Sequence, residues 1–243
     1  MDKVVNVLVF CWVVLLGVAA QAQPRVVVVP LGGATGDAVA GDDIFTGVIP
    51  ASPNRTLVRY RVTATDLFGA TRRAPFADDP SLNFAAFVYD GVPAYEGIAA
   101  ADLESLPVYF FITRAQDLTT CTAYTGNQMV QGSPAWFVFN WQCAVVCDGE
   151  VYDHVCYRLR GANGRYQPGK RSFRFKFNDG RHLAARDPSG ARYPTKWSSL
   201  DTGKGQSNQQ TLTFGLNEAV NYFLWNKVGV PAPFSHFFHW RVI

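Results

Sequence analysis

The chain has 243 residues, of which 48% are hydrophobic, and its 22 basic and 19 acidic residues give a formal net charge of +3. The hydrophobic share, with 18 phenylalanines, is enough to build sizeable cores. A net charge this small argues against a general nucleic-acid-binding surface, so we expect no nucleic acid among the partners.

The first 22 residues have the features of a secretory signal peptide. Lys3 supplies the positive charge, an apolar core follows from Val4 to Ala20, and Ala20-Gln21-Ala22 is a small-x-small cleavage site. The apolar run is short for a spanning helix and no stop-transfer charges follow it, although an uncleaved anchor is the alternative. We therefore expect a secreted, periplasmic or cell-surface protein without stable membrane insertion after cleavage. N-terminal sequencing of an exported product that begins at Gln23 would check this.

Cleavage leaves about 220 residues, enough for one large or two small domains. Between residues 23 and 100, short β-branched segments such as Arg25–Pro30 alternate with clusters of Pro, Gly, Asn and Asp. Thr56–Asp66 alternates cleanly between two faces, as a strand does. The pattern predicts a β-sandwich-like module. Gly91–Ser105 is predicted to be a linker into a second unit.

Residues 105–243 are predicted to be mostly β with one helix, so the whole chain is assigned to the α+β class. Strands are expected at Leu106–Thr113, Ala135–Gln142, Glu150–Arg160 and Phe234–Ile243, with Cys143–Gly149 as a turn. Residues 114–134 are expected to be irregular, and Asp179–Gln210 to be a long loop with one short strand. Thr211–Val228 is the one predicted helix, because apolar residues recur at helical spacing before Gly229 and Pro231.

Four cysteines follow the predicted signal peptide: Cys121, Cys143, Cys147 and Cys156. In an oxidising compartment an even number indicates two disulfides, and four cysteines allow three pairings. A zinc site with His154 as an additional ligand is the alternative. Because no CxxC pair is present and Cys143-x3-Cys147 is loose for a zinc knuckle, disulfides are preferred, with their pairing left open.

The most informative stretch is Tyr157–Asn178, which reads strand, glycine loop, strand. The loop contains Gly161, Gly164, Pro168 and Gly169, and in the strand that follows Lys170, Ser172, Arg174 and Lys176 face one way and Arg171, Phe173, Phe175 and Phe177 the other. Cations gather at the loop. This arrangement suits an anionic ligand, because loop amides and cationic side chains can converge on phosphate oxygens.

Two kinds of phosphate loop were compared with this stretch. Gly164-x4-Gly169-Lys170 has P-loop spacing, but Arg171 stands where Ser or Thr is required, and a strand follows instead of a helix. A protein kinase instead uses a glycine-rich hairpin loop over the phosphates and a strand lysine that pairs with a helix glutamate. Glu218 is the candidate glutamate. An ordinary twisted hairpin with solvated cations is the alternative.

Several motifs, in order, resemble the first half of the CotH (spore-coat protein H) kinase-like domain. They are Leu106-Pro-Val-Tyr, Asp148-Gly-Glu-Val-Tyr-Asp-His-Val, Tyr157-Arg-Leu-Arg-Gly, Gly169-Lys-Arg-Ser-Phe-Arg-Phe-Lys-Phe-Asn, Leu216-Asn-Glu-Ala-Val-Asn and Gly229-Val-Pro-Ala-Pro. Together they span residues 105–243. The strand at Thr56–Asp66 resembles β-sandwich modules that often precede such domains in exported proteins.

The resemblance implies an exported atypical kinase with a kinase N-lobe-like first half. Such an enzyme uses ATP and Mg to phosphorylate Ser or Thr in secreted or surface proteins. The cofactor-binding residues that it implies here are Arg160, Gly161, Gly164, Gly169, Lys170, Lys176 and Glu218. Lys170 and Lys176 are alternatives for the lysine that contacts phosphate, and Glu218 is the ion-pair partner of that lysine.

The chain departs from the family pattern in two ways. Gly169 and Arg171 replace the proline and the second lysine of the usual Pro-Lys-Lys-Ser. The family's catalytic and metal-binding aspartates belong to the second half of the domain, which would lie beyond Ile243. We therefore expect a truncated domain, inactive as given, with no catalytic or metal-binding residue. A non-catalytic extracellular binding module is the alternative function, and a poorly folding gene fragment is a third possibility.

Overall fold

A computed structural model describes residues 48–79, 83–123, 141–160, 171–187, 189–203 and 216–243, and the backbone alone of residues 8–17 and 25–31. The chain divides into two compact units. The first comprises Met1–Ala100 with Gly149–Asp153 and Ile243, and the second comprises Ala101–Asp148 with His154–Val242. The main division, after Ala100, falls inside the segment predicted to be a linker.

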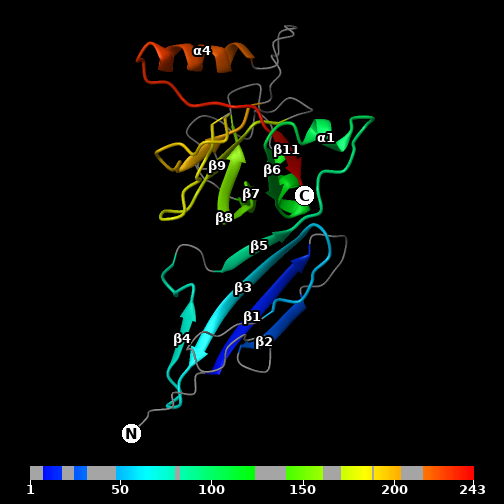
Figure 1. The fold of residues 1–243 in the computed structure, drawn as a ribbon, viewed down its shortest axis with the longest axis vertical. Helices are drawn as coiled ribbons and strands as arrows, with labels where there is room; N and C mark the ends of the chain where they lie inside the picture. Colours follow the sequence, from blue (N-terminus) through cyan, green and yellow to red (C-terminus); the bar gives the residue numbers. More distant parts are fainter. Residues whose placement is uncertain are drawn as a thin grey trace. The chain divides into compact units, whose positions relative to one another are not determined.

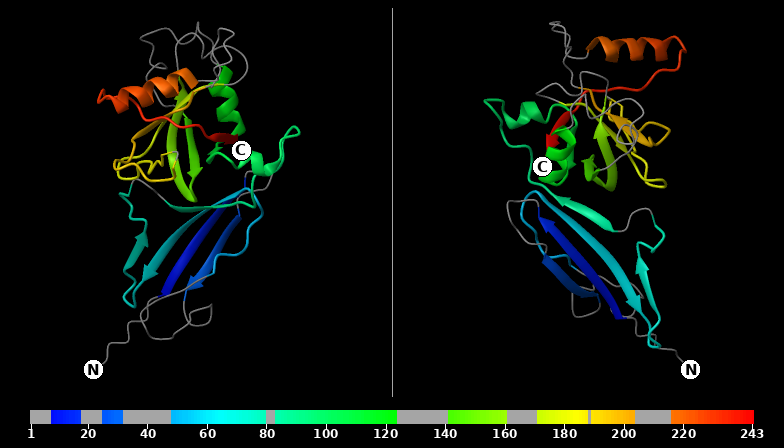
Figure 2. Two further views of the ribbon diagram at one scale, coloured as in Figure 1. Left: turned by 45° about the horizontal axis from the view of Figure 1, so that its top comes forward. Right: turned by 180° about the vertical axis from the view of Figure 1, so that it is seen from behind.

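The first unit is a five-stranded sheet built on β3 (Thr56–Thr65), drawn in cyan in Figure 1. One edge of β3 pairs antiparallel with β1 (Leu8–Gly17), which pairs in turn with β2 (Arg25–Leu31). The other edge pairs with β5 (Phe84–Val88) and β4 (Thr71–Ala74), so β3 has partners on both sides, as the views in Figure 2 show. The described residues of this unit form one sheet, without the second layer of a sandwich.

Strand β1 lies inside the predicted signal peptide. Its register places Trp12 opposite Arg61 of β3 and Val28 of β2. A continuous apolar run is compatible with both a signal-peptide core and a buried strand, because neither needs polar residues at regular spacing. Signal cleavage stays a prediction, and cleavage after Ala22 would remove this strand from the sheet.

The second unit is organised on a six-stranded sheet of order β10-β9-β8-β7-β6-β11. Its strands are β6 (Val108–Ile112), β7 (Trp141–Cys147), β8 (Glu150–Leu159), β9 (Phe173–Lys176), β10 (Ser199–Asp201) and β11 (His239–Val242). β11 runs parallel to β6, whereas β6–β7, β8–β9 and β9–β10 are antiparallel. The predicted mostly β composition is confirmed.

A turn shorter than predicted joins β7 to β8. The sequence predicted a turn over Cys143–Gly149, but β7 continues to Cys147, and only Asp148 and Gly149 connect the strands. Both turn residues have positive φ, 51° and 75°. This is the pattern of a type I′ hairpin, for which Asp-Gly is a preferred pair because its twist matches that of the strands.

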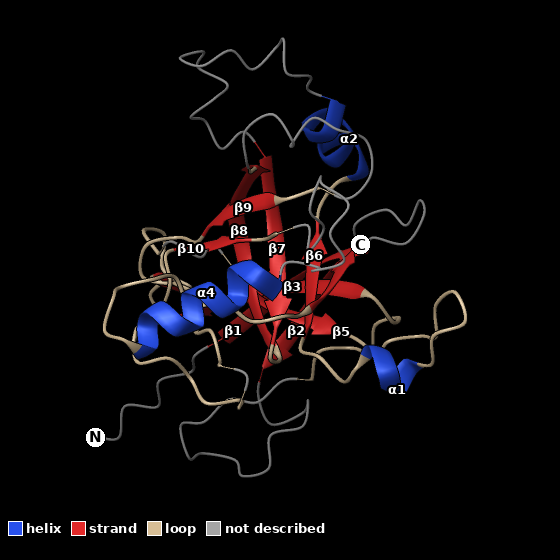
Figure 3. Cartoon of the chain, turned by 90° about the horizontal axis from the view of Figure 1, so that it is seen from above, coloured by secondary structure: helices blue, strands red, loops and turns tan. Residues whose placement is uncertain are grey.

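The described residues contain the helices α1 (Ala100–Leu103), α2 (Ala115–Ala123) and α4 (Leu216–Lys227), shown in blue in Figure 3. The expectation that residues 114–134 are irregular was wrong for α2. Three threonines in α2 donate their hydroxyls to the carbonyls four residues earlier: Thr119, Thr120 and Thr122. Threonine has low helix propensity, which hid this helix in the sequence.

Helix α4 confirms the predicted helix and its cap, although residues 211–215 lie outside the described part of the chain. Gly229 has a φ of 82°, its amide donates to the Asn226 carbonyl, and the Val230 amide donates to the Trp225 carbonyl at 2.8 Å. These two bonds form a Schellman motif, which ends the helix by satisfying its last carbonyls.

The core of the second unit is a cluster of aromatic rings around Phe111, which is fully buried. Ring centroids of Tyr157, Phe175 and Trp240 lie 4.8, 5.2 and 5.6 Å from that of Phe111. The predicted alternation in β9 is confirmed, because Phe173 and Phe175 are buried between the more exposed Arg174 and Lys176. The strand predicted from phenylalanine spacing therefore supplies two rings of this cluster, Phe173 and Phe175.

We predict that Gly149→Ala destabilises the protein by about 1 kcal/mol, because alanine is strained at positive φ. A Cβ at this position meets nothing within 4 Å, so the cost comes from the backbone conformation. Gly149→Asn is the matched variant, because asparagine tolerates the left-handed region. Urea denaturation should rank the three proteins Gly, Asn, Ala in decreasing stability. Equal midpoints for the Asn and Ala variants would contradict the turn assignment.

Candidate functional site

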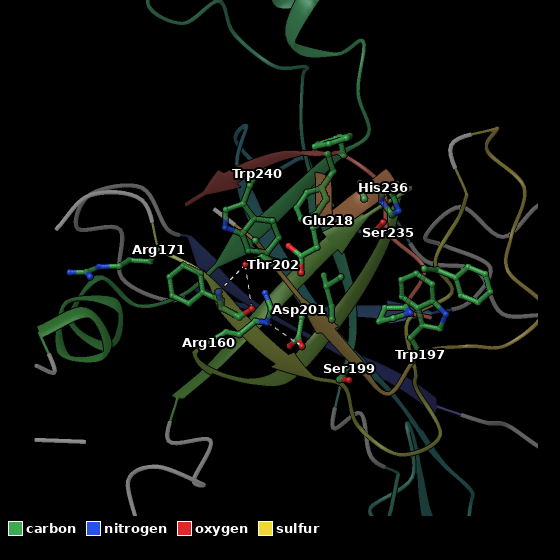
Figure 4. Close-up of a pocket in the computed structure, with 18 of the residues that line it drawn as sticks. Arg160, Arg171, Trp197, Ser199, Asp201, Thr202, Glu218, Ser235, His236 and Trp240 are labelled. Atoms are coloured by element: carbon green, nitrogen blue, oxygen red, sulfur yellow. Dashed lines mark hydrogen bonds and ion pairs between the residues drawn. The ribbon is translucent and has the colours of Figure 1, made fainter. Parts of the chain in front are cut away.

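The second unit contains a cavity of about 920 Å³. Its walls come from α2, the facing ends of β8 and β9, the end of β10, helix α4 and the segment 232–242. Figure 4 shows Asp201, Thr202 and Glu218 together in the middle of the site, whereas the Arg171 side chain points away from them. Segments far apart in the sequence thus meet at one site.

The two ends of the glycine loop lie at this cavity. The Arg160 amide donates to the Ser172 carbonyl at 2.8 Å, which adds a hydrogen bond to the β8–β9 hairpin just before the loop. Arg160 and Arg171 both line the cavity. Loop residues 161–170 lie outside the described part of the chain. Two cationic side chains therefore flank the loop that was predicted to cover phosphates.

Helix α4 contributes a carboxylate and a phenol. Glu218, Ala219 and Tyr222 line the cavity, and the Tyr222 hydroxyl donates to Glu218 Oε1 at 2.9 Å. This hydrogen bond and, to a smaller extent, burial raise the pKa of Tyr222. Arg160 lowers the pKa of Tyr222 and Asp201 raises it, so both charges lie within electrostatic reach of the Tyr222 hydroxyl.

A second carboxylate, Asp201, holds two arginines. In the β9–β10 register Asp201 lies opposite Arg174, and the two side chains form a bidentate pair, with Arg174 Nε 2.6 Å from Asp201 Oδ1 and Nη2 bonded to Oδ2. Arg160 Nε approaches Asp201 Oδ2 at 3.4 Å. The bond to Asp201 raises the pKa of Arg174. Of the two arginines, Arg160 lines the cavity and Arg174 does not.

Another part of the cavity wall is aromatic. The rings of Trp197 and Phe234 are nearly parallel, at 5°, with centroids 6.4 Å apart, and both residues line the cavity. Tyr193 packs against both rings, at 4.9 and 4.6 Å, and braces them. Trp240 also lines the cavity, and its buried Nε1 has no hydrogen-bond partner within the described residues.

The structure brings together two of the residues predicted from the sequence, Arg160 and Glu218. Lys176 is exposed and does not line the cavity, and Glu218 accepts a hydrogen bond from Tyr222. The other predicted residues lie outside the described part of the chain: Gly161, Gly164, Gly169 and Lys170. Whether Lys170 reaches Glu218 stays a prediction.

Sequence reasoning missed the other polar groups of the cavity, Asp201 and Tyr222, and its aromatic wall. Asp201 lay in a polar stretch assigned to a loop, and no motif marks it. Tyr222 follows Glu218 by four residues, a spacing at which helical side chains meet, so this pair was within reach of the sequence. The pairing of Trp197 with Phe234 depends on tertiary structure alone.

No disulfide joins the four cysteines in the structure, so the predicted disulfides are not found. Cys143 and Cys147 lie on one strand, β7, where four residues span about 13 Å, well beyond disulfide reach. Cys143 Sγ instead donates to the Val155 carbonyl at 3.4 Å. Cys121 is buried on α2.

The described residues contain neither a candidate metal site nor a candidate membrane-spanning helix. No group of three or more His, Cys, Asp or Glu side chains could hold a metal ion. No helix among these residues has the length and apolar character needed to cross a bilayer. His236 and His239 have separate partners, with His236 Nε2 3.3 Å from the Tyr109 hydroxyl and His239 Nδ1 3.2 Å from the Leu103 carbonyl oxygen.

Comparison of the chain with protein-family models, with curated proteins and with solved structures found no match.

We predict that Cys121 stays a protonated thiol in the folded protein. Burial raises the pKa of Cys121 from 9.0 to about 12. Because the thiolate is the reactive form, Cys121 should resist iodoacetamide at pH 8 until urea unfolds the chain. A raised pKa contributes stability that is complete below the unfolded value, so stability should fall as pH rises from 9 toward 12.

Peptide mass spectrometry after alkylation without reductant checks the same cysteines. All four thiols should be labelled once the chain is unfolded. Labelling that appears only after a reductant is added would show disulfides and would contradict this arrangement.

Proposed function

We propose that the second unit binds a nucleoside triphosphate in its cavity. In this proposal it is the nucleotide-binding half of an exported, CotH-type atypical protein kinase acting on Ser or Thr of secreted or surface proteins. One observation carries the proposal: Arg160, which directly precedes the glycine loop, lines the same cavity as Glu218 of α4. Glycine loop, cations and helix glutamate are the parts that kinases gather around phosphates.

The chemistry of the walls supports a nucleotide rather than a bare anion. Guanidinium groups bind phosphate oxygens through charge-assisted hydrogen bonds. The parallel rings of Trp197 and Phe234 offer an apolar surface on which a base can stack, a contact that aromatic side chains make with any base.

Each residue predicted from the sequence has a separate role in this proposal. Gly161, Gly164 and Gly169 would lie over the phosphates, as the resemblance implies. Because Lys176 does not line the cavity, Lys170, next to the lining residue Arg171, takes the role of the phosphate-contacting lysine. Glu218, held by Tyr222 in the structure, would be the ion-pair partner of Lys170.

The described residues do not fit a magnesium site of their own, because no group of three ligating side chains is found among them. Magnesium would therefore enter with the nucleotide. We assign nucleotide binding to this chain and no catalytic residue.

Isothermal titration calorimetry with ATP tests the proposal on the full chain. Arg160→Gln should weaken ATP binding by about tenfold or more, since a hydrogen bond to a charged group contributes roughly 1.5–3 kcal/mol. Lys170→Ala should weaken it similarly, whereas Lys176→Ala, outside the cavity, is the matched control and should leave it within about twofold. ATP binding that is absent, or is indifferent to Arg160→Gln, would refute the proposal.

A second candidate, a non-catalytic extracellular binding module, is favoured by the outer face of α4. No residue of this helix is buried, and it exposes large apolar side chains: Leu216, Val220, Phe223, Leu224 and Trp225. Exposed apolar patches of this kind mark interaction sites. Capture of a surface protein that is lost with Leu224→Asp but kept with Arg160→Gln, without any ATP effect on the melting temperature, would favour this function.

A further inference from the structure

We infer that the Asp201 carboxylate competes with anionic ligands for Arg160. This competition lowers the affinity of the cavity for anions, most of all for those with the highest charge. The inference rests on the proposed function and names the residue that sets its charge selectivity. It starts from the fact that Arg160, the predicted phosphate-binding side chain, already has a carboxylate at 3.4 Å (Figure 4).

Asp201 does not depend on Arg160 for its position. Its stronger partner is Arg174, which binds both carboxylate oxygens and lies directly opposite in the β9–β10 register. Arg174 does not line the cavity, whereas Asp201 and Arg160 do. The bidentate contact thus fixes the carboxylate at the cavity wall, and Arg160 makes the longer contact of the two.

A ligand phosphate can therefore bind Arg160 without displacing the Asp201 carboxylate from the cavity wall. The carboxylate keeps its bidentate partner and stays at the wall as a fixed negative charge beside the ligand. Charges a few ångströms apart at a protein surface interact by about 1 to 4 kcal/mol, so this repulsion is large enough to matter. Because the repulsion grows with ligand charge, ATP loses more affinity than AMP does.

Glu218 places a second carboxylate in the same cavity, but it differs from Asp201 in its partner. Its Oε1 accepts a hydrogen bond from the neutral Tyr222 hydroxyl, and it forms no ion pair with an arginine of the described residues. The influence of Asp201, Glu218 and Arg160 on the pKa of Tyr222 is consistent with one electrostatically coupled cluster. Among these groups Asp201 is the one that contacts the predicted phosphate ligand Arg160.

The test uses two substitutions that break the same ion pair and should change ATP affinity in opposite directions. Asp201→Asn removes the competing charge, so ATP should bind about tenfold more tightly and AMP only about threefold. Arg174→Met removes the preferred partner of Asp201, which leaves the carboxylate to Arg160, so ATP should bind several-fold more weakly. Calorimetry with metal-free ATP and with AMP measures both effects.

Matched controls distinguish this role of Asp201 from a general effect of net charge and from loss of folded structure. Asp179→Asn and Arg181→Met make the same charge changes outside the cavity, and the Asp179 side chain is 98% exposed. Both should leave ATP affinity within about twofold. Thermal denaturation identifies any variant that does not fold. A merely structural role of the Arg174–Asp201 pair would weaken binding in both variants, because both lose that pair.

The outcomes distinguish the two proposals. If Arg160→Gln weakens ATP binding but Asp201→Asn does not strengthen it, the competitor role is wrong and the nucleotide site stands. If the wild-type chain and every variant fail to bind ATP and AMP, both proposals are wrong. Equal gains of ATP and AMP on Asp201→Asn would also overturn the charge selectivity.

Discussion

The β8–β9 hairpin is the constraint on which the second unit depends. On one face it buries Phe173 and Phe175 in the cluster around Phe111, which holds the hairpin rigidly in the sheet. At its open end the bond between the Arg160 amide and the Ser172 carbonyl fixes where the glycine loop begins and ends. Because these contacts are buried or belong to the backbone ladder, the cationic ends of the loop are positioned by the core and not by the ligand.

A cavity of mixed character follows from this frame. The cations come from the hairpin, the carboxylates from β10 and α4, and the apolar wall from rings braced by Tyr193. Such a cavity does not simply attract anions, because Asp201 offsets part of the charge of Arg160 and Arg174. Internal carboxylates of this kind favour ligands in which a limited charge is combined with a flat apolar part.

The elements that were predicted correctly from the sequence are those that depend on the pattern of neighbouring residues. Alternating phenylalanines located β9, and Gly229 and Pro231 located the end of α4, because period and capping chemistry are written in neighbouring residues. Three features of the structure could not be predicted from the sequence. Helix α2 is rich in threonine, which has low helix propensity, and the two cysteines of β7 were assigned to a turn. The contact of Asp201 with Arg160 depends on the pairing of β9 with both β8 and β10. Of the site, Arg160 was predicted from the resemblance and Glu218 already from the kinase-like pattern. Tyr222 was missed although its helical spacing from Glu218 was readable, whereas Asp201 and Trp197 had no signal in the sequence.

The central claim is that a nucleotide occupies the cavity between the hairpin, α4 and the aromatic wall. Photolabelling with 8-azido-ATP, followed by peptide mapping, tests it most directly, because the azide marks residues that lie beside the base. The account predicts labelling in the lining segments around Trp197 and Phe234 that excess ATP prevents. Labelling confined to the first unit, or labelling that ATP does not prevent, would contradict it.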